Sequence, residues 1–349
     1  MYENFTSRYK NVLITGGYGF IGSCLIRNLL INTKSKICNI DKLNYASNLN
    51  SISSLFKEKK DIDEKRYYFE KIDLNERTKV ELIFQKFKPD IVFHLAAETH
   101  VDRSILNPKL FIENNILATF NLLEVAKNYW EKIERERNDF LFIHVSTDEV
   151  FGSLGDQGFF NENTPYKPNS PYSASKASSD HLAKSWNKTF NFPSIVTNCS
   201  NNYGPWQYPD KLIPVIINNA LNQEKIPIYG NGRNIRDWLH VEDHVEALIL
   251  TALCGKVGKN YCIGSGNERT NLEIALHICE IIDSFNPKNS PHKELINFTK
   301  DRLGHDYRYS IDNTFAKNTL GWQPKFNFDK GLKSTVSWYI KHKNMLLGL

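Results

Sequence analysis

A run of glycines near the start of the chain constrains the fold more than any other feature. Gly16, Gly19 and Gly22 follow directly after the short apolar run 11–15, and a helical pattern of apolar residues begins at Ile21. Gly16 permits a tight turn, Gly19 lets backbone amides approach a pyrophosphate, and Gly22 lets the helix pack closely. Glycine turns are common, and this GxxGxxG spacing is one residue wider than GxGxxG. Alone, the run predicts a strand, a turn and a helix that suit a phosphate group.

An acidic residue stands where a dinucleotide fold needs one. The second apolar run, 36–40, ends in Asp41, nineteen residues after Gly22. A carboxylate there accepts hydrogen bonds from both ribose hydroxyls of an adenosine and repels a 2′-phosphate. The position therefore favours NAD over NADP. The alternative is an aspartate that caps a loop after a strand.

Short apolar runs alternate with amphipathic stretches through the first half of the chain. We expect strands at 67–71, 90–95, 140–146 and 194–197, and helices at 76–87, 108–129 and 172–190. This alternation predicts an α/β fold with a Rossmann-type, doubly wound parallel sheet, whose ligands lie beyond the carboxyl ends of the strands.

The character of the chain changes at Asn198. Loops rich in Asn, Gly, Pro and aromatic residues follow, and loops placed by a rigid sheet commonly carry specificity. No linker or repeat is evident, so the two domains are expected to interleave. We expect an NAD-binding Rossmann domain at 1–197, with later strands from about 226–262, and a smaller, mainly substrate-binding domain at 198–349.

The overall composition narrows the class of protein. The chain has 349 residues, 41% of them hydrophobic, and its 44 basic and 39 acidic residues give a net charge of +5 without a basic tail. We therefore expect a globular protein with no nucleic-acid partner. The six cysteines show no CxxC spacing and are expected to be reduced and buried. No apolar run approaches the roughly 18 residues of a membrane span, so we expect no membrane partner and a cytoplasmic location.

Tyr172 and Lys176 lie one helical turn apart in the stretch PYSASK. An ammonium near a phenol favours the phenolate and lowers the pKa of the tyrosine, which would make Tyr172 a general base for an alcohol proton. The YxxxK spacing also occurs by chance, as a surface tyrosine beside a solvated lysine. Its combination with the glycine turn, Asp41 and an upstream hydroxyl residue favours the catalytic interpretation.

Two adjacent carboxylates precede this pair in the chain. Thr147, Asp148 and Glu149 follow the expected strand 140–146. An enzyme that only oxidises or reduces an alcohol at one carbon has no evident use for both carboxylates. If their pKa values are split, one can take a carbon-bound proton while the other protonates a departing hydroxyl, which together eliminate water. The alternative is a solvated acidic turn.

Two further groupings carry weaker signals. His240 and His244 are four residues apart, but no third ligand is evident and Glu242 suits a helix start, so no metal site is expected. The charged turn 301–308 contains arginines that can hold a diphosphate, and its alternative is a salt-bridged surface loop.

The chain resembles the extended short-chain dehydrogenase/reductase superfamily of NAD-dependent epimerases and dehydratases, and within it the dTDP-glucose 4,6-dehydratases. The resemblance covers nearly the whole chain. The matching segments are TGGYGFIGS, HLAAETHVDRS, VSTDEVFG, PYSASKASSD, NCSNNYGP, KLIP, PIYGNGRNIRDWLHVEDH and DRLGHDYRY. The Thr-Asp-Glu triplet separates these dehydratases from sugar-nucleotide epimerases, and NCSNNYGP followed by KLIP is also specific.

The resemblance implies a hydro-lyase that recycles a tightly bound NAD within each turnover. Tyr172 would take the proton of the sugar 4-hydroxyl during oxidation at C4, with Lys176 tuning the phenol and holding the ribose. Glu149 would remove the C5 proton and Asp148 would protonate the departing 6-hydroxyl, while Thr147 hydrogen-bonds O4. Hydride return to C6 would give dTDP-4-keto-6-deoxyglucose, a precursor in deoxysugar biosynthesis such as the rhamnose pathway.

The resemblance also implies two sets of binding residues. The cofactor set is Gly16, Gly19, Phe20, Ile21, Gly22, Asp41, Lys42, Leu43, Asn44, Asp73, Leu74, Leu95, Ala96, Ala97, Thr99, Asn114, Tyr172, Lys176 and Asn202. The substrate set is Thr99, Thr147, Asn201, Lys211, Leu212, Pro227, Ile228, Tyr229, Arg236, Asn271, Asp301, Arg302 and His305. Leu303 stands where the family usually has Pro, and Asn114 where Thr is common. The family typically forms homodimers through the helices near 108–129 and 172–190.

Two other functions stay open. A UDP-glucose 4,6-dehydratase would share the chemistry, because the base and ribose contacts lie in loops that the sequence does not shape. A catalytically idle, NAD-binding regulatory or scaffold protein would share the fold, although such a protein is expected to have lost Tyr172, Lys176 or a carboxylate, and all are present.

Overall fold

A computed structural model describes residues 1–132 and 140–342. Within these residues a seven-stranded parallel sheet has the order β10-β6-β5-β4-β1-β2-β3. Its strands are β1 (Asn11–Thr15), β2 (Lys36–Asp41), β3 (Tyr67–Lys71), β4 (Ile91–His94), β5 (Leu141–Thr147), β6 (Ser194–Cys199) and β10 (Asn260–Ile263). Positions 133–139 and 343–349 of the two expected domains lie outside the described residues. The order reverses between β1 and β4, which confirms the doubly wound Rossmann-type sheet.

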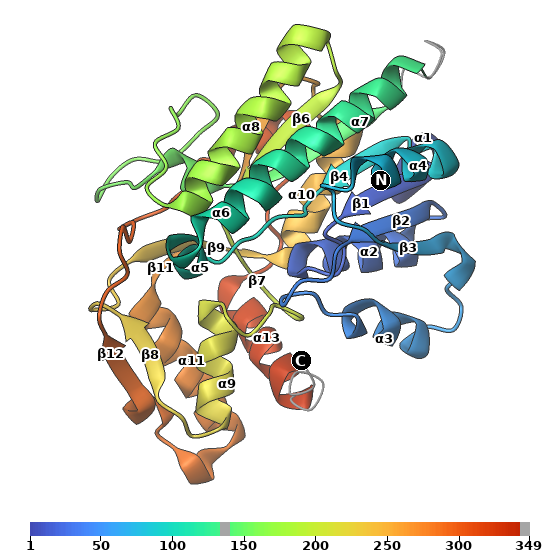
Figure 1. Cartoon of the computed structure of the whole chain (residues 1–349). Coiled ribbons are helices and arrows are strands. Elements are labelled where there is room, and N and C mark those ends of the chain that lie inside the picture. The colour runs from blue at the N-terminus through green and yellow to red at the C-terminus, as the bar shows by residue number, and fades with distance from the viewer. Residues whose placement is uncertain (133–139, 343–349) are drawn as a thin grey trace.

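Helices cover both faces of this sheet (Figure 1). In β1, Val12 and Ile14 pack into the core on one face, whereas Leu13 packs into the core on the other. Burial on both faces explains why these strands read as continuous apolar runs. The first face is covered by α1 (Tyr2–Arg8), α2 (Phe20–Asn32), α3 (Asn50–Glu58), α10 (Val241–Cys254) and α12 (Thr314–Leu320), and the second by α4 (Arg77–Phe87), α7 (Ala118–Lys132) and α8 (Pro171–Phe190).

The expected helix 108–129 is not uniform. It begins as α6 (Pro108–Phe111), widens into a π-helix at Ile112–Leu117 and continues as α7 to Lys132. The wide turn buries two consecutive residues, Asn114 and Asn115. The side chain of Asn115 accepts a hydrogen bond from the Glu98 N–H (2.8 Å) and donates one to the Glu98 carbonyl (2.9 Å). These bonds fix the segment after β4, and π-turns of this kind are frequent beside functional sites.

A smaller part of the molecule has a core of its own (Figure 1). It contains β8 (Ile226–Tyr229), which pairs with β12 (Ile296–Thr299), together with α9 (Leu212–Leu221), α11 (Asn271–Phe285) and α13 (Phe328–Lys341). Of the stretch 226–262 that was expected to join the first domain, β10 and α10 do lie with the large sheet. By contrast, β8 does not, because Ile226 and Ile228 are buried in the smaller core.

The remaining elements are a small sheet and several short helices. A three-stranded sheet consists of β7 (Asn201–Tyr203), β9 (Ile235–His240) and β11 (Glu268–Thr270), and the short helices are α5 (Val101–Leu106), η1 (Glu64–Arg66), η3 (Asp148–Phe151), η4 (Pro287–Asn289) and η5 (His292–Leu295). No helix among the described residues has the length and apolarity to cross a bilayer. All six cysteines are free, but the expectation that they are buried is wrong for Cys254, which is exposed at the end of α10.

Candidate active site

A cavity of about 540 Å³ lies between the two parts of the molecule. The carboxyl ends of β2, β5 and β6 and the turns after β1 and β4 line one side, and residues of α9, β8 and β9 line the other. The structure brings together nearly all of the residues expected from the sequence. Those that do not line the cavity are Leu43, Asp148, Ile228 and Asp301.

The glycine turn forms the end of the cavity beneath α2. Gly16 has φ of +70°, and a Cβ at this position would lie 2.7 Å from the Cα of Ala96. A Cβ on Gly22 would lie 2.3 Å from the Gly16 carbonyl oxygen. The expected tight turn and close helix packing are thereby confirmed. Gly16, Gly19 and Gly22 also line the cavity, so this backbone faces the space where a phosphate group can lie at the start of α2.

Asp41 ends β2 at the edge of the cavity. Its carboxylate accepts hydrogen bonds from the backbone N–H groups of Tyr18 (2.9 Å) and Leu43 (2.8 Å). The side chain is thus held at the position where an adenosine ribose would lie after a glycine turn. Leu43 contributes this backbone bond and packs its side chain on the hydrophobic core, which explains why it does not line the cavity.

Buried polar atoms beside the cavity also fit a polar ligand. Asn114 lines the cavity, its Oδ1 accepts from Lys42, and its Nδ2 is buried without a hydrogen-bond partner. A buried amide without a partner is costly in a folded protein unless a ligand or water satisfies it. Asp73 and Leu74 lie in the same wall. The glycine turn, Asp41 and Asn114 together match the needs of a bound dinucleotide.

The Thr-Asp-Glu triplet forms a tight turn at the end of β5. Thr147 Oγ1 accepts a hydrogen bond from the Glu149 N–H and donates one to Asp148 Oδ1, both at 3.3 Å. Thr147 and Glu149 line the cavity. Asp148 lies behind this lining, where it is almost fully buried and its Oδ2 has no hydrogen-bond partner.

The two carboxyls have different electrostatic surroundings. Burial raises the pKa of Asp148 well above its usual value, and the charges of Glu149 and Asp237 raise it further. Burial also raises the pKa of Glu149, but the cations Arg236 and Lys211 oppose this shift. Asp148 is therefore the carboxyl that holds a proton, and Glu149 is the one that cations favour as an anion.

Tyr172 and Lys176 enter the cavity from α8. The helix begins with a capping box between Ser170 and Ser173, which fixes its first turn. Tyr172 lies in hydrogen-bond contact with Thr147, and Lys176 Nζ donates to the Val145 carbonyl at 2.9 Å.

The expected lowering of the Tyr172 pKa is wrong for this arrangement. Burial raises its pKa well above the usual value, and the charge of Glu149 adds to the shift, whereas the hydrogen bond with Thr147 opposes it. The Lys176 ammonium is directed at the Val145 carbonyl, and the phenol keeps its proton.

Cations gather at the end of the cavity formed by the smaller part. Lys211 donates to the Thr99 carbonyl (2.8 Å), Arg236 donates to the Asp306 carbonyl (2.9 Å), and Arg302 makes two hydrogen bonds with Asp102 (2.6 and 2.8 Å). Side chains fixed in this way form a preorganised site for an anion. The other expected residues that line this end are Thr99, Asn201, Leu212, Pro227, Tyr229, Asn271 and His305.

Two expected substrate residues do not face the cavity. Ile228 alternates with its neighbours along β8 and is fully buried in the smaller core. Asp301 instead accepts a hydrogen bond from Nδ1 of His305 at 2.6 Å, so it orients a residue that does line the cavity.

Several lining residues were missed from the sequence. They include Tyr45, His100, Asp102, Cys199, Gln207, Tyr208, Asp210 and Trp238. The sequence offered a signal for several of them. His100 and Asp102 are part of the segment HLAAETHVDRS, and Gln207 and Asp210 lie between NCSNNYGP and KLIP.

The paired histidines occupy structural positions. His240 caps α10 by accepting a hydrogen bond from the Glu242 N–H, and His244 lies 3.0 Å from Oδ1 of Asn202. In the part of the chain that the structure describes, no group of three His, Cys, Asp or Glu residues is placed to hold a metal ion.

Known proteins resemble the chain over nearly its full length. The family model described as GDP-mannose 4,6 dehydratase matches residues 13–335. A dTDP-glucose 4,6-dehydratase from Neisseria gonorrhoeae is 47% identical over 344 residues, which are 97% of this chain and 98% of that protein. The chain belongs to the dTDP-glucose 4,6-dehydratase family.

Solved structures of dTDP-glucose 4,6-dehydratases have the same fold. The enzyme from Bacillus anthracis in complex with NAD is 41% identical, with a TM-score of 0.83 over 97% of this chain and 99% of that chain. The enzyme from Streptomyces venezuelae with NAD bound is 36% identical, with a TM-score of 0.86 over 95% of this chain and 98% of that chain. The superfamily and the fold class expected from the sequence are confirmed.

The two departures from the family pattern have different surroundings. Leu303 is 70% exposed and does not line the cavity. Asn114 does line it, in the π-helix, and contacts Lys42. The first departure therefore lies outside the cavity lining, and the second lies within it.

Proposed function

We propose that the protein is a dTDP-glucose 4,6-dehydratase, an NAD-dependent hydro-lyase that forms dTDP-4-keto-6-deoxyglucose. One observation carries the proposal: the hydroxyl of Thr147, the carboxyl of Glu149 and the phenol of Tyr172 line one cavity, between the glycine turn and the cluster of cations. A proton-transfer site between a dinucleotide site and an anion site suits redox and elimination on a nucleotide sugar.

The two ends of the cavity divide the ligands between them. We assign NAD to the part built on the large sheet, near Gly16 and Asp41, and the nucleotide sugar to the part that carries Lys211, Arg236 and Arg302. This division follows the expected domains 1–197 and 198–349, with α10, β10 and α12 returning to the large sheet. The diphosphate would lie among the arginines, whose planar donors match phosphate oxygens.

When bound, NAD supplies a hydride acceptor and donor and, in its oxidised form, a positive charge beside the phenol. A positive charge favours the phenolate, so it opposes the burial that raises the pKa of Tyr172. Tyr172 then takes the proton of the sugar 4-hydroxyl, and Thr147, which touches Tyr172, hydrogen-bonds the same oxygen as it gains charge. Lys176 stabilises this charge from one helical turn away.

The carboxyls carry out the elimination. Glu149, surrounded by Arg236 and Lys211, takes the C5 proton once C4 is a ketone. Asp148, which burial keeps protonated, gives its proton to the 6-hydroxyl as water leaves. Asp148 lies just behind the lining, and its hydrogen bond with Thr147 ties it to a residue that faces the sugar. We propose that a rotation of the Asp148 side chain brings the carboxyl to the cavity during this step.

We further propose a cytoplasmic homodimer. The six free cysteines suit a reducing compartment. The helices expected at the dimer contact expose Ile112, Leu117, Phe120 and Phe190. Exposed apolar side chains grouped on neighbouring helices are typical of a subunit interface.

Turnover of two nucleotide sugars tests the function. The protein is incubated with dTDP-glucose or UDP-glucose, and the keto product is followed by its alkali-induced absorbance. We expect product from dTDP-glucose; product from UDP-glucose alone would support the UDP-glucose enzyme instead. Absence of product with both sugars, with NAD bound, would support the idle regulatory or scaffold protein.

A substitution tests the base. Glu149→Gln should abolish product formation while NAD stays bound. Glu162→Gln is a matched control, because Glu162 accepts a hydrogen bond from the Cys262 N–H outside the cavity lining. Full activity of Glu149→Gln, or formation of a 4-epimer by the unmodified protein, would show that the assignment of the carboxyls is wrong.

A further inference from the structure

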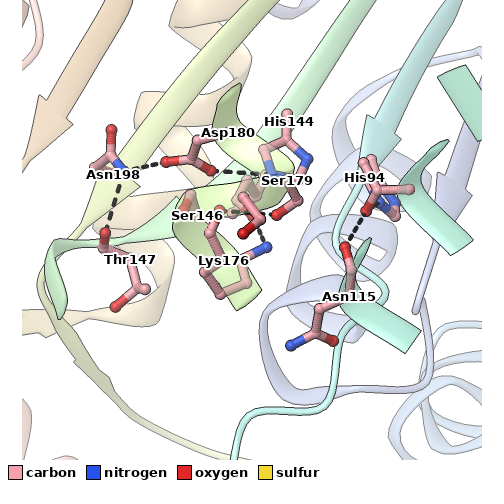
Figure 2. Close-up of polar contacts among 12 residues, drawn as sticks. His94, Asn115, His144, Ser146, Thr147, Lys176, Ser179, Asp180 and Asn198 are labelled. Atoms are coloured by element: carbon pink, nitrogen blue, oxygen red, sulfur yellow. Dashed lines mark hydrogen bonds and ion pairs between the residues drawn. The ribbon is translucent and has the colours of Figure 1, made fainter. Parts of the chain in front are cut away.

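A buried carboxylate lies behind the catalytic lysine (Figure 2). Asp180 is four residues after Lys176 on α8, so the two side chains share one face of the helix. Its Oδ2 accepts hydrogen bonds from the hydroxyl of Tyr166 (2.8 Å) and from Nδ2 of Asn198 (2.9 Å), and its Oδ1 lies 3.1 Å from Nε2 of His144. The residue is 0% exposed and does not line the cavity, so it does not touch a ligand there.

The bonds of Asp180 connect three elements that carry the active site. Asn198, at the end of β6, donates from the same Nδ2 to the Thr147 carbonyl at 3.1 Å. His144 and Val145 are neighbours on β5, and the Val145 carbonyl accepts from Lys176. Figure 2 shows these side chains converging between β5, β6 and α8. The carboxylate therefore joins the helix that bears Tyr172 and Lys176 to the strand end that bears the Thr-Asp-Glu triplet.

Lys176 needs an anion, because it is a buried ammonium with 5% exposure. The titratable groups that act on it from the packed elements are Asp180 on α8, Cys199 on β6, His144 on β5 and His94 on β4. Burial raises the pKa of the Cys199 thiol and lowers the pKa of His144 to about 4 and that of His94 well below its usual value. At neutral pH these three groups are uncharged.

Asp180 differs from them in charge. Burial alone would raise its pKa, but the contact with His144 and the charge of Lys176 outweigh that cost, and the pKa lies below its usual value. Lys184, one turn further along α8, also acts on the carboxylate and donates to Tyr166. Asp180 is therefore the anion of this cluster.

We propose that Asp180 is a positioning residue for the dehydratase reaction, which keeps Lys176 as an ammonium and holds it against the Val145 carbonyl in register with the Thr-Asp-Glu turn. The proposal rests on the proposed function, because it assigns Asp180 a role through Lys176. A purely architectural network of buried hydrogen bonds would stabilise the fold equally well without affecting the charge of Lys176. The two roles differ in what they do to the pH dependence of turnover.

Asp180→Asn tests the charge with little change of shape. We expect the folded, NAD-loaded variant to turn over dTDP-glucose at least about tenfold more slowly, with the alkaline limb of kcat moved down by about one pH unit or more, because Lys176 loses its proton more readily without the anion. Tyr166→Phe is the matched control. It removes one hydrogen bond from the same carboxylate and leaves its charge, so its alkaline limb should stay in place.

The control separates the two roles. An unmoved alkaline limb in a folded Asp180→Asn variant, or an equal shift in Tyr166→Phe, would overturn the proposal. If the unmodified protein did not turn over dTDP-glucose, the proposed function would fail first, whereas an active protein with an unmoved limb would refute only the role of Asp180.

A double substitution covers the case in which Asp180→Asn does not fold. If Asp180 compensates the charge of Lys176, Lys176→Met combined with Asp180→Asn removes the unpaired ammonium and should fold, with a melting temperature above that of Asp180→Asn. A double variant that is as unstable as the single one would show that Asp180 acts only as part of the hydrogen-bonded core.

Discussion

Asp148 offers a thermodynamic test of the active site that does not depend on turnover. Its carboxyl is buried without a partner for Oδ2, beside Glu149 and Asp237, and all of these surroundings raise its pKa. The folded protein therefore holds this proton at pH values at which the unfolded chain has released it. Stability from such a group is complete below the unfolded pKa and is lost as the pH rises toward the folded pKa.

The expected effect of Asp148→Asn follows from this sign. The amide cannot ionise, so the variant does not lose stability through this group as the pH rises. Its free energy of unfolding should therefore increase relative to that of the unmodified protein from about pH 4 upward. One proton limits the slope to about 1.4 kcal/mol per pH unit. The relative gain continues until the pH passes the folded pKa of Asp148, and above that it is constant.

Urea unfolding followed by tryptophan fluorescence at pH 3, 4, 5, 6, 7 and 8 measures the difference. Glu268→Gln is a control of opposite sign, because hydrogen bonds from Arg308 (2.6 and 2.8 Å) lower the pKa of Glu268. The free energy of unfolding of the unmodified protein should increase relative to that of Glu268→Gln as the pH rises from acid values. A constant difference between Asp148→Asn and the unmodified protein over this range, or a relative loss with rising pH, would refute the reasoning.

Three further substitutions test the cavity. Gly22→Ala places a Cβ 2.3 Å from the Gly16 carbonyl oxygen, and we expect this clash to cost about 1–3 kcal/mol. NAD binding measured by calorimetric titration should therefore weaken about 5- to 150-fold. Unchanged affinity for NAD would contradict the assignment of a phosphate site to this turn. Asp41→Asn should weaken the binding of NAD and reduce the preference of the protein for NAD over NADP, because the carboxylate that repels a 2′-phosphate is gone. The affinities for the two cofactors measure this change. Arg236→Ala removes a cation that lowers the pKa of Glu149, so this pKa should rise and the acidic limb of the pH profile of kcat should move to higher pH. An acidic limb that stays in place would count against Glu149 as the base.

Local patterns made much of the fold predictable. The glycine turn and the strands of the large sheet follow from apolar runs and from residue types that act over a few positions, and the structure has them as expected. The partner of β8 did not follow, because β12 lies about seventy residues later in the chain. The π-helix at Ile112–Leu117 was also missed, since it depends on the bonds of Asn115 to the loop after β4.

The candidate site was predictable in its members and less so in its electrostatics. YxxxK and the Thr-Asp-Glu triplet name residues that the fold does place together. The pKa of Tyr172 was expected in the wrong direction, because burial and the charge of Glu149 come from the folded surroundings and not from the spacing to Lys176. Asp180 escaped notice for the same reason: its partners His144, Tyr166 and Asn198 come from three separate segments.

The chain passes repeatedly between the two parts of the molecule, and this has a mechanical consequence. After β6 it enters the smaller part at α9, returns at α10 and β10, leaves at α11, returns at α12 and leaves again at α13. Each passage acts as a tether, so a hinge motion of the two parts would have to bend several connecting segments at once. We expect ligands to enter by movement of loops at the mouth while the frame stays stiff. In a frame of this kind the sugar ring, and not the protein, would make the shift between oxidation at C4 and reduction at C6.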